Sequence, residues 1–272
     1  MSQLIERPAF DADSSSEGSG EYRVAPTGSR EQTRCLLAHG FNGEPVDMCE
    51  LDDHLRALGF ATKNLLLPGH GTSVRDFAAH GWSDWFGAVE AEVQQAQRRG
   101  ERVILIGHSM GASVGLALAA RDQRVVGVAA LCPPLSLNPV TYQFIRTVRQ
   151  FVPYIPSWRE DIRDRRGARL RYTRNAYTWT ALSTVESLLA ALPELRQALP
   201  ALQCPVLVVC ARRDHVVPLR DGLETFQLLG TEDKELLVLE HSYHAVTKDM
   251  ERHRVFERVL RFCQRVHSAT AS

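Results

Sequence analysis

The 272-residue chain carries 32 Lys and Arg residues against 32 Asp and Glu residues, so its formal net charge is zero. Such a balance gives no overall field to gather nucleic acid or an anionic membrane, and it argues against a nucleic-acid partner. The length is enough for a self-sufficient core and predicts one α/β domain with a small insertion, not two full domains.

Cysteine usage is typical of a reducing compartment. The six cysteines show no Cys-x-x-Cys spacing, and most stand in or beside apolar runs, where free thiols behave as small hydrophobic side chains: Cys35, Cys49, Cys132, Cys204, Cys210 and Cys263. The N-terminus lacks a basic segment followed by an apolar stretch, and no uncharged apolar run reaches the roughly 18 residues of a membrane span. We therefore expect a soluble cytoplasmic protein without integral membrane association.

The chain divides into a tail and one domain. Residues 1–20 end in the polar, glycine-rich stretch DADSSSEGSG, whose composition predicts a flexible tail, and residues 21–272 form the predicted domain. Its predicted strands cover 35–38, 62–67, 103–106, 125–132, 205–210 and 235–240, and its predicted helices include 46–58, 84–99 (with Ser83 as N-cap) and 248–266. This alternation predicts a mainly parallel central sheet with helices on both faces, which binds ligands beyond the carboxyl ends of its strands.

The strongest local signal is the stretch 103–120, VILIGHSMGASVGLALAA. An apolar run ends abruptly and resumes with small and aliphatic residues at helical spacing, which predicts a strand, a sharp turn and a helix. Gly107 and Gly111 flank Ser109 where a Cβ atom would clash with neighbouring backbone on so tight a turn. The context favours Ser109 as a nucleophile over a glycine-rich turn with an idle serine.

Between Pro133 and Pro205 the alternation of strands and helices is interrupted, with no convincing strand. A structureless loop of this length is not expected in a compact domain, so about 135–200 is predicted to be an insertion with helices of its own. Two sets of apolar residues give it helical faces: Phe144, Ile145, Val148, Phe151 and Val152, then Leu182, Val185, Leu188, Leu189 and Leu192. The insertion would lie over the strand ends as a cap and shape the pocket.

A serine hydroxyl needs a base to take its proton, and that base needs a third group to orient it. Asp214 follows the predicted strand 205–210, and His244 follows the predicted strand 235–240. The order Ser, Asp, His, with each residue past a strand end, is the order that this type of hydrolase requires. We therefore predict Ser109, Asp214 and His244 as the catalytic residues.

Other candidates for the acid and the base are weaker. His241 comes too soon, at the strand terminus itself, and Asp221 is placed to open a helix after Pro218, where a carboxylate favours the helix N-terminus. His108, beside the serine, is expected to point away from the hydroxyl and to pack as a neighbour of the site. Three further histidines are expected to fix loops: His39, His70 and His215.

A tetrahedral intermediate also needs two N–H donors. The residue after the nucleophile, Met110, supplies one from the start of its helix, and the glycine loop after strand 35–38 supplies the other, which we assign to Phe41. Both groups belong to the backbone, so the two side chains are free to line the pocket.

Five motifs resemble the bacterial carboxylesterase and monoacylglycerol lipase branch of the α/β-hydrolase fold: HGFNG at 39–43, LPGHGTS at 67–73, GHSMGA at 107–112, RRDHVVP at 212–218 and SYHAVTKD at 242–249. They follow the family's order, and the resemblance spans about 33–265. It implies the same triad and oxyanion donors, a small cap, and a substrate such as a monoacylglycerol or another short- to medium-chain acyl ester. One departure is Ala112, where the family usually has a second glycine.

Together these residues predict a serine hydrolase of carboxylic esters that needs no cofactor and acts on a small-molecule ester with an apolar acyl chain. No histidine pairs with carboxylates or thiols at metal-ligand spacing. Two alternatives stay open: a thioesterase or acyltransferase with the same triad, and a non-catalytic binding protein on the same fold.

The insertion also contains an arginine-rich stretch: Arg159, Arg163, Arg165, Arg166, Arg169, Arg171 and Arg174. Guanidinium groups bind phosphate and carboxylate through paired hydrogen bonds, which would suit an anionic headgroup or an acyl carrier. A solvated helical face is the simpler interpretation.

Overall fold

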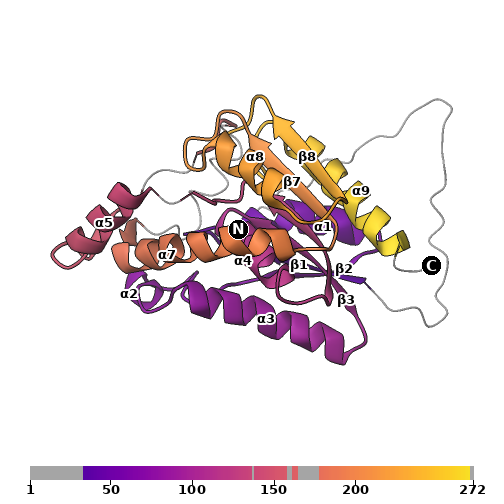
Figure 1. Ribbon diagram of the computed structural model, residues 1–272, viewed down its shortest axis with the longest axis horizontal. Helices are drawn as coiled ribbons and strands as arrows, with labels where there is room; N and C mark the ends of the chain where they lie inside the picture. Colours follow the sequence, from indigo (N-terminus) through magenta and orange to yellow (C-terminus); the bar gives the residue numbers. More distant parts are fainter. Residues whose placement is uncertain (1–32, 137, 158–160, 165–177, 270–272) are drawn as a thin grey trace, which may run out of the picture.

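The computed structural model describes residues 33–136, 138–157, 161–164 and 178–269. Within these ranges, strands alternate with helices around one central sheet (Figure 1). Its strands are β1 (Thr33–Ala38), β2 (Ala61–Leu65), β3 (Arg102–His108), β4 (Val125–Leu131), β7 (Val206–Ala211) and β8 (Lys234–Leu239). All neighbours pair in parallel, in the order β2-β1-β3-β4-β7-β8, so the predicted fold class is confirmed. The predicted tail 1–20 lies outside the described residues.

The loops that follow β1 and β3 leave the sheet at a topological switch point. Strand β1 pairs with β2 on one side and with β3 on the other, so the chain reverses its direction of travel across the sheet here. Ala38 at the end of β1 pairs with Gly107 near the end of β3, and Gly107 pairs with Ala130 in β4. The carboxyl ends of these three strands therefore meet at one edge, where open α/β sheets bind ligands.

Successive residues of each strand face opposite layers of helices. On one face, Cys35, Leu37 and Ile104 pack against a layer formed by α1 (Cys49–Ala57) and α9 (Arg252–Ala269). On the other, Leu36 and Leu105 pack against a layer that includes α3 (Trp82–Arg98), α4 (Met110–Ala119), α7 (Leu182–Ala198) and α8 (Leu219–Leu228). Burial on both faces explains why these strands form continuous apolar runs.

Three predicted helix starts shift in the structure. The predicted helix 46–58 begins as a 3-10 turn, η1 (Pro45–Asp47), and continues as α1. Helix α3 begins at Trp82, so the N-cap prediction for Ser83 is wrong: Gly81 holds that place and donates its N–H to the Asp84 carboxylate at 2.9 Å. Helix α9 begins at Arg252, since the residues before it form turns. Turns therefore precede α1 and α9, whereas α3 begins earlier in the chain than predicted.

The insertion contains the predicted helices and also a short antiparallel pair of strands that the sequence did not predict. Its elements are α5 (Pro139–Val148), β5 (Tyr154–Pro156), β6 (Trp179–Ala181), α7 and η2 (Leu199–Ala201). Helix α5 has no buried residue and projects beyond the end of the sheet, whereas α7 packs on α4 (Figure 1). Among the helices of the described ranges, none combines the length and apolar character needed to cross a bilayer.

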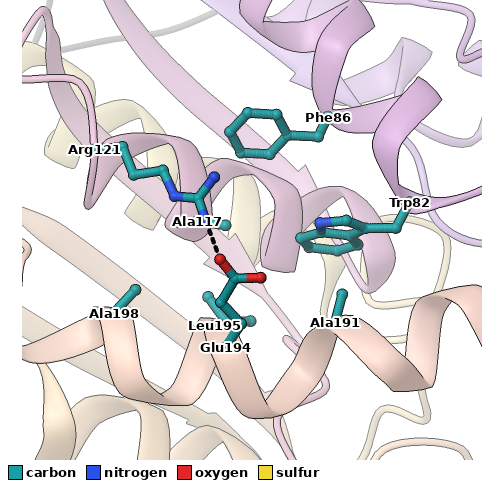
Figure 2. Close-up of a pocket in the computed structure, with 8 residues that line it drawn as sticks. All are labelled: Trp82, Phe86, Ala117, Arg121, Ala191, Glu194, Leu195 and Ala198. Carbon is teal, nitrogen blue, oxygen red and sulfur yellow. Dashed lines mark hydrogen bonds and ion pairs between the residues drawn. The ribbon is translucent and has the colours of Figure 1, made fainter.

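A small cavity lies between residues of α3, α4 and α7 (Figure 2). Its lining includes Trp82, Phe86 and Ala117, and Arg121 of the loop after α4 pairs with Glu194 of α7 across it. Ala117 lies near the C-terminal end of α4 and Arg121 just beyond it, whereas Ser109 precedes the N-terminal end. This cavity is therefore a packing gap between helices and not part of the candidate site.

All six cysteines are free thiols in the structure, and four of them are buried. Burial raises the pKa of Cys204 and of Cys210 to about 12, so both stay protonated near neutral pH. They act as small packing residues.

Candidate active site

The turn between β3 and α4 holds Ser109 in a strained conformation. Ser109 has φ 52° and ψ −117°, in the left-handed range of φ that side-chain-bearing residues rarely adopt. A Cβ atom at Gly107 would lie 2.3 Å from the carbonyl carbon of Gly111, and one at Gly111 would lie 2.4 Å from the carbonyl oxygen of Ala38. The predicted need for glycine at both positions is confirmed. Strain of this kind, held by close packing, is typical of functional sites.

The loop after β1 lies directly against this turn. A Cβ atom at Gly40 would be 3.2 Å from the Cβ of Ser109. The loop is fixed by His39, whose Nδ1 lies 2.9 Å from the carbonyl oxygen of Gly40 and whose Nε2 accepts the N–H of Leu67 at 3.2 Å. His39 therefore holds the loop on which Phe41 stands, as predicted for a loop-fixing histidine.

A cluster of aromatic rings packs against the loop that follows β1. The ring of Phe41 packs edge-on against Phe77 and Trp85, with centroids 5.2 and 6.0 Å away, and His70 lies 4.7 Å from the rings of both His39 and Phe77. Burial, assisted by the neighbouring His39, lowers the pKa of His70 to about 3. His70 is therefore a neutral packing residue of this loop at physiological pH.

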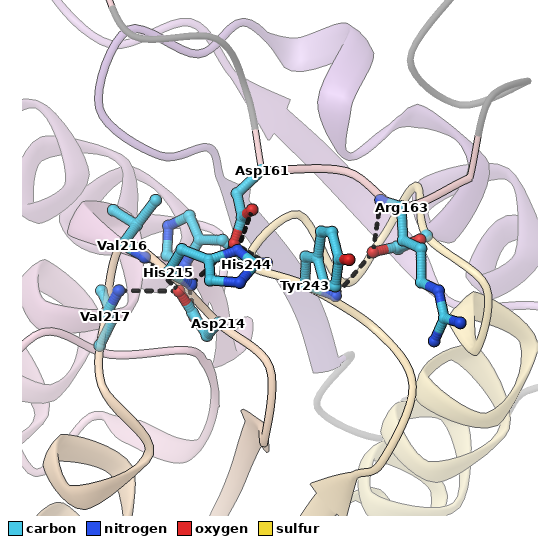
Figure 3. A network of polar contacts seen from close by, with 9 residues as sticks. Asp161, Arg163, Asp214, His215, Val216, Val217, Tyr243 and His244 are labelled. Carbon is cyan, nitrogen blue, oxygen red and sulfur yellow. Dashed lines mark hydrogen bonds and ion pairs between the residues drawn. The ribbon is translucent and has the colours of Figure 1, made fainter.

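Asp214 and His244 form the ionisable pair at the ends of β7 and β8 (Figure 3). Oδ2 of Asp214 lies 2.7 Å from Nδ1 of His244, and Oδ1 accepts the N–H groups of Val216 and Val217 at 2.8 and 2.7 Å. Burial by itself raises the pKa of Asp214, but the hydrogen bond and charge of His244, with the two backbone N–H groups, outweigh it and bring the pKa below its usual value. The aspartate is therefore ionised and can orient the imidazole.

The weaker candidates for acid and base occupy other places. His241 is exposed, and its N–H donates to Glu251 at 2.8 Å. Asp221 is buried in α8 and accepts the N–H groups of Leu135 and Ser136, so it anchors the start of the insertion, a partner that the sequence did not reveal. Neither residue takes part in the hydrogen bond between Asp214 and His244.

His108 connects the serine turn to the histidine loop. Its Nε2 lies 3.0 Å from the carbonyl oxygen of His244, and the two rings are 4.8 Å apart. Within the described residues, the side chain of Ser109 makes no hydrogen bond to His244, and the contact between the serine turn and the histidine loop is made by His108. Met110 starts α4, and the first N–H groups of a helix have no acceptor within it.

One neighbour of the pair was missed by the sequence analysis. Cys132, at the end of β4, has φ 50°, and its sulfur lies within 4.8 Å of ligand-type atoms of Asp214 and His244. These are the groups at the site that could approach a metal ion. However, burial first, and then the Asp214 charge, raise the pKa of the Cys132 thiol well above its usual value, which opposes the thiolate that a metal would need. No spacing in the sequence could have signalled this contact.

Of the arginine-rich stretch, Arg163 alone lies within the described residues. Its backbone N–H donates to Asp249 at 3.1 Å, and its guanidinium donates to the carbonyl oxygen of His241 at 3.1 Å. This arginine therefore contacts the histidine loop. The other six arginines lie outside the described residues, so the choice between a solvated helical face and an anion site stays open.

A parallel sheet flanked by two helical layers, a strained serine between a strand and a helix, and a histidine–aspartate pair after the last two strands define a serine hydrolase of the α/β-hydrolase fold. Residues 29–251 match the family described as serine aminopeptidase, S33. The chain belongs to that family.

Individual relatives are esterases and lipases. The chain is 26% identical over 227 residues to the thermostable monoacylglycerol lipase of Bacillus sp. (strain H-257), covering 84% of this chain and 88% of that protein. It is 25% identical over 238 residues to a carboxylesterase of Bacillus subtilis (strain 168), covering 85% and 92%. A solved structure from the metagenome-derived lipolytic enzymes LipS and LipT matches with a TM-score of 0.80 and 27% identity, covering 86% of this chain and 94% of that one. The protein is thus an α/β-hydrolase of the esterase and lipase type.

Proposed function

We propose that this protein hydrolyses carboxylic esters through Ser109, His244 and Asp214, without a cofactor. The observation that carries the proposal is the 2.7 Å contact between an ionised Asp214 and Nδ1 of His244. It is supported by Ser109, which is held at φ 52° on a turn where neither flanking glycine leaves room for a Cβ atom. These are the parts that an activated serine nucleophile requires.

In the proposed mechanism, Ser109 Oγ attacks the ester carbonyl while Nε2 of His244 takes its proton. Asp214 holds the ring with Nδ1 protonated, so that Nε2 is free to act as the base, and stabilises the imidazolium that forms. The hydrogen bond from serine to histidine is expected to form in the substrate complex, since catalytic hydrogen bonds are often long before substrate binds. The imidazolium then protonates the departing alcohol, and water hydrolyses the acyl-enzyme by the same route in reverse.

The tetrahedral intermediates carry a negative oxygen that needs donors. The backbone N–H groups of Met110 and Phe41 are the proposed pair, because Met110 begins α4 and the Phe41 loop lies against Ser109. Each donor of this kind lowers the barrier by about 3 kcal/mol. The aromatic packing of Phe41 on Phe77 and Trp85 would keep its loop in place during the reaction.

The proposed substrates are short- to medium-chain acyl esters, with monoacylglycerols among them. Apolar side chains of the insertion support an acyl chain as the group to be bound: Phe144, Phe151, Val152 and Trp179 are all exposed. The relatives named as monoacylglycerol lipase and carboxylesterase are consistent with the same class of substrate.

The test is covalent labelling with a fluorophosphonate, followed by identification of the modified peptide and by hydrolysis of p-nitrophenyl esters from C2 to C16. We expect modification at Ser109 and rates that peak at medium chain length. Ser109→Ala should abolish labelling and lower kcat about 10⁵- to 10⁶-fold. Ser113→Ala is the matched control on the same helix, because the Ser113 hydroxyl already donates a hydrogen bond to the carbonyl oxygen of Pro134 at 2.9 Å.

Three outcomes would contradict the proposal. If Ser109→Ala retains a tenth of the activity, or if the folded protein is not labelled, Ser109 is not the nucleophile. If kcat/KM for a thioester far exceeds that for the matched oxygen ester, the same triad belongs to a thioesterase and the substrate class is wrong.

A further inference from the structure

A carboxylate of the insertion joins the two loops that carry the proposed acid and base. Oδ2 of Asp161 accepts the backbone N–H of His215 at 2.8 Å and the backbone N–H of His244 at 3.2 Å. Its Oδ1 lies 2.6 Å from Nδ1 of His215, and its own carbonyl oxygen accepts the N–H of Ala245 at 3.1 Å. Figure 3 shows Asp161 and Asp214 approaching His244 from opposite sides.

The two aspartates hold His244 in different ways. Asp214 contacts the ring, whereas Asp161 contacts the backbone that carries the ring. One oxygen of Asp161 also holds the residue directly after Asp214, so the spacing between the acid loop and the base loop depends on this carboxylate. The Asp161 side chain is 12% exposed, and hydrogen bonds from N–H groups to a largely buried carboxylate are among the stronger ones in proteins.

Asp161 is itself fixed by a second buried carboxylate. Asp249 accepts the backbone N–H groups of Arg163 and Asp164 at 3.1 and 2.8 Å, and that of Tyr243 at 2.7 Å. The segment 161–164 is therefore attached to the histidine loop at both of its ends. It forms a short brace between the insertion and the catalytic loops.

We propose that Asp161 is a positioning residue for the reaction. It fixes the position of the His244 backbone relative to Asp214, and through it the orientation of Nε2 towards Ser109. This inference rests on the proposed function. The physical reason is that a misplacement of a catalytic group by about 1 Å can reduce a rate about 100-fold. Because Asp161 lies on the backbone side of the histidine loop, its loss should change the rate of chemistry more than the binding of an ester.

The experiment compares Asp161→Ala and Asp161→Asn with Asp164→Asn on a medium-chain ester. We expect Asp161→Ala to lower kcat about 10- to 100-fold with KM within twofold of the native value. Asp161→Asn should retain more activity, because its remaining carbonyl oxygen can still accept a backbone N–H. The second-order rate constant of fluorophosphonate labelling should fall by the same factor as kcat, since both depend on the orientation of the His244 imidazole.

Asp164→Asn is the matched control, because it lies in the same short segment and its side chain accepts a hydrogen bond from Arg252 of α9 at 3.1 Å. It should keep kcat and KM within twofold. If Asp161→Ala has the same kcat as Asp164→Asn, the proposal is overturned. If Asp161→Ala does not fold, Asp161→Asn decides: a kcat equal to the control overturns the proposal, and a kcat at least threefold lower supports it.

The outcome can be separated from failure of the proposed function. Labelling of the native protein at Ser109 tests the nucleophile by itself. A labelled native protein whose Asp161 variants behave like the control overturns this inference alone, whereas an unlabelled native protein overturns the proposed function.

Discussion

The serine turn and helix α5 of the insertion are both predicted to contribute to one site, but they are built in opposite ways. Every residue of α4 is buried, and the turn before it is so tightly packed that backbone atoms occupy the space of two missing Cβ atoms. Helix α5 has no buried residue, and its Phe144 is 65% exposed. The proposed nucleophile is thus held in the rigid core, and the surface proposed to meet the acyl chain lies where side chains can change at little cost.

The insertion is nevertheless attached at its base. Thr180 of β6 accepts a hydrogen bond from Asn42 of the loop after β1 at 2.8 Å, and Asp161 holds the loops after β7 and β8. The insertion therefore contacts the site from both sides while α5 projects away. The difference between fixed base and exposed helix can be tested by substitutions at increasing distance from the serine turn.

The largest effect is expected at Gly111. In Gly111→Ala the new methyl group would meet the carbonyl oxygens of Ala38 and His39 at 2.4 and 2.7 Å, and these backbone atoms cannot move without shifting the loop that carries Phe41. We expect a loss of about 3 kcal/mol in the free energy of unfolding, measured by urea titration, together with a large fall in kcat.

Gly115→Ala, one turn further along α4, is the control for that substitution. Its Cβ would meet Leu105 at 3.5 Å, an ordinary contact, and Ala is the better helix former by up to about 1 kcal/mol. This variant should be as stable as the native protein or slightly more so. Equal losses for both variants would show that the turn is no tighter than the rest of the helix.

A smaller, pH-dependent effect is expected at His70, which supports the Phe41 loop. The pKa of this histidine is about 3 in the folded protein against 6.5 for an unperturbed side chain. Between these values the unfolded chain binds a proton that the folded protein does not, so stability falls as the pH is lowered from 6.5 towards 3. At pH 5 the loss from this group amounts to about 2 kcal/mol.

His70→Asn removes the titrating ring while keeping an N–H donor for the carbonyl oxygen of Pro68, which lies 3.1 Å from Nδ1 in the native protein. The free energy of unfolding should be measured for both proteins at pH 7.5 and pH 5. We expect the native protein to lose about 2 kcal/mol more than the variant over this interval. Equal losses would mean that His70 is not the group that titrates.

The smallest effect is expected on α5. Phe144→Ser removes a large apolar side chain that is 65% exposed, so the free energy of unfolding should change by less than about 0.5 kcal/mol. Hydrolysis of medium-chain esters should be affected more than that of acetyl esters if this face meets the acyl chain. A loss of stability above about 1 kcal/mol would show instead that α5 belongs to the packed core.

The sequence by itself determined the fold and the candidate serine. Gly107, Ser109 and Gly111 predict the turn because its steric limits act within a few residues of backbone. The six strands were found because burial on both faces of a parallel sheet leaves continuous apolar runs, and positions past strand ends were enough to propose Asp214 and His244. These signals are local in the chain, so no packing needs to be known.

The tertiary structure alone decided which distant groups meet. Asp161 bonds to residues 54 and 83 positions away, Asp221 bonds to the start of the insertion, and Cys132 lies beside the Asp214–His244 pair. The sequence also placed apolar residues on a face of α5 without indicating that the face is exposed. Such contacts depend on how loops and helices pack after the chain has folded, and no periodicity or spacing along the chain encodes that packing.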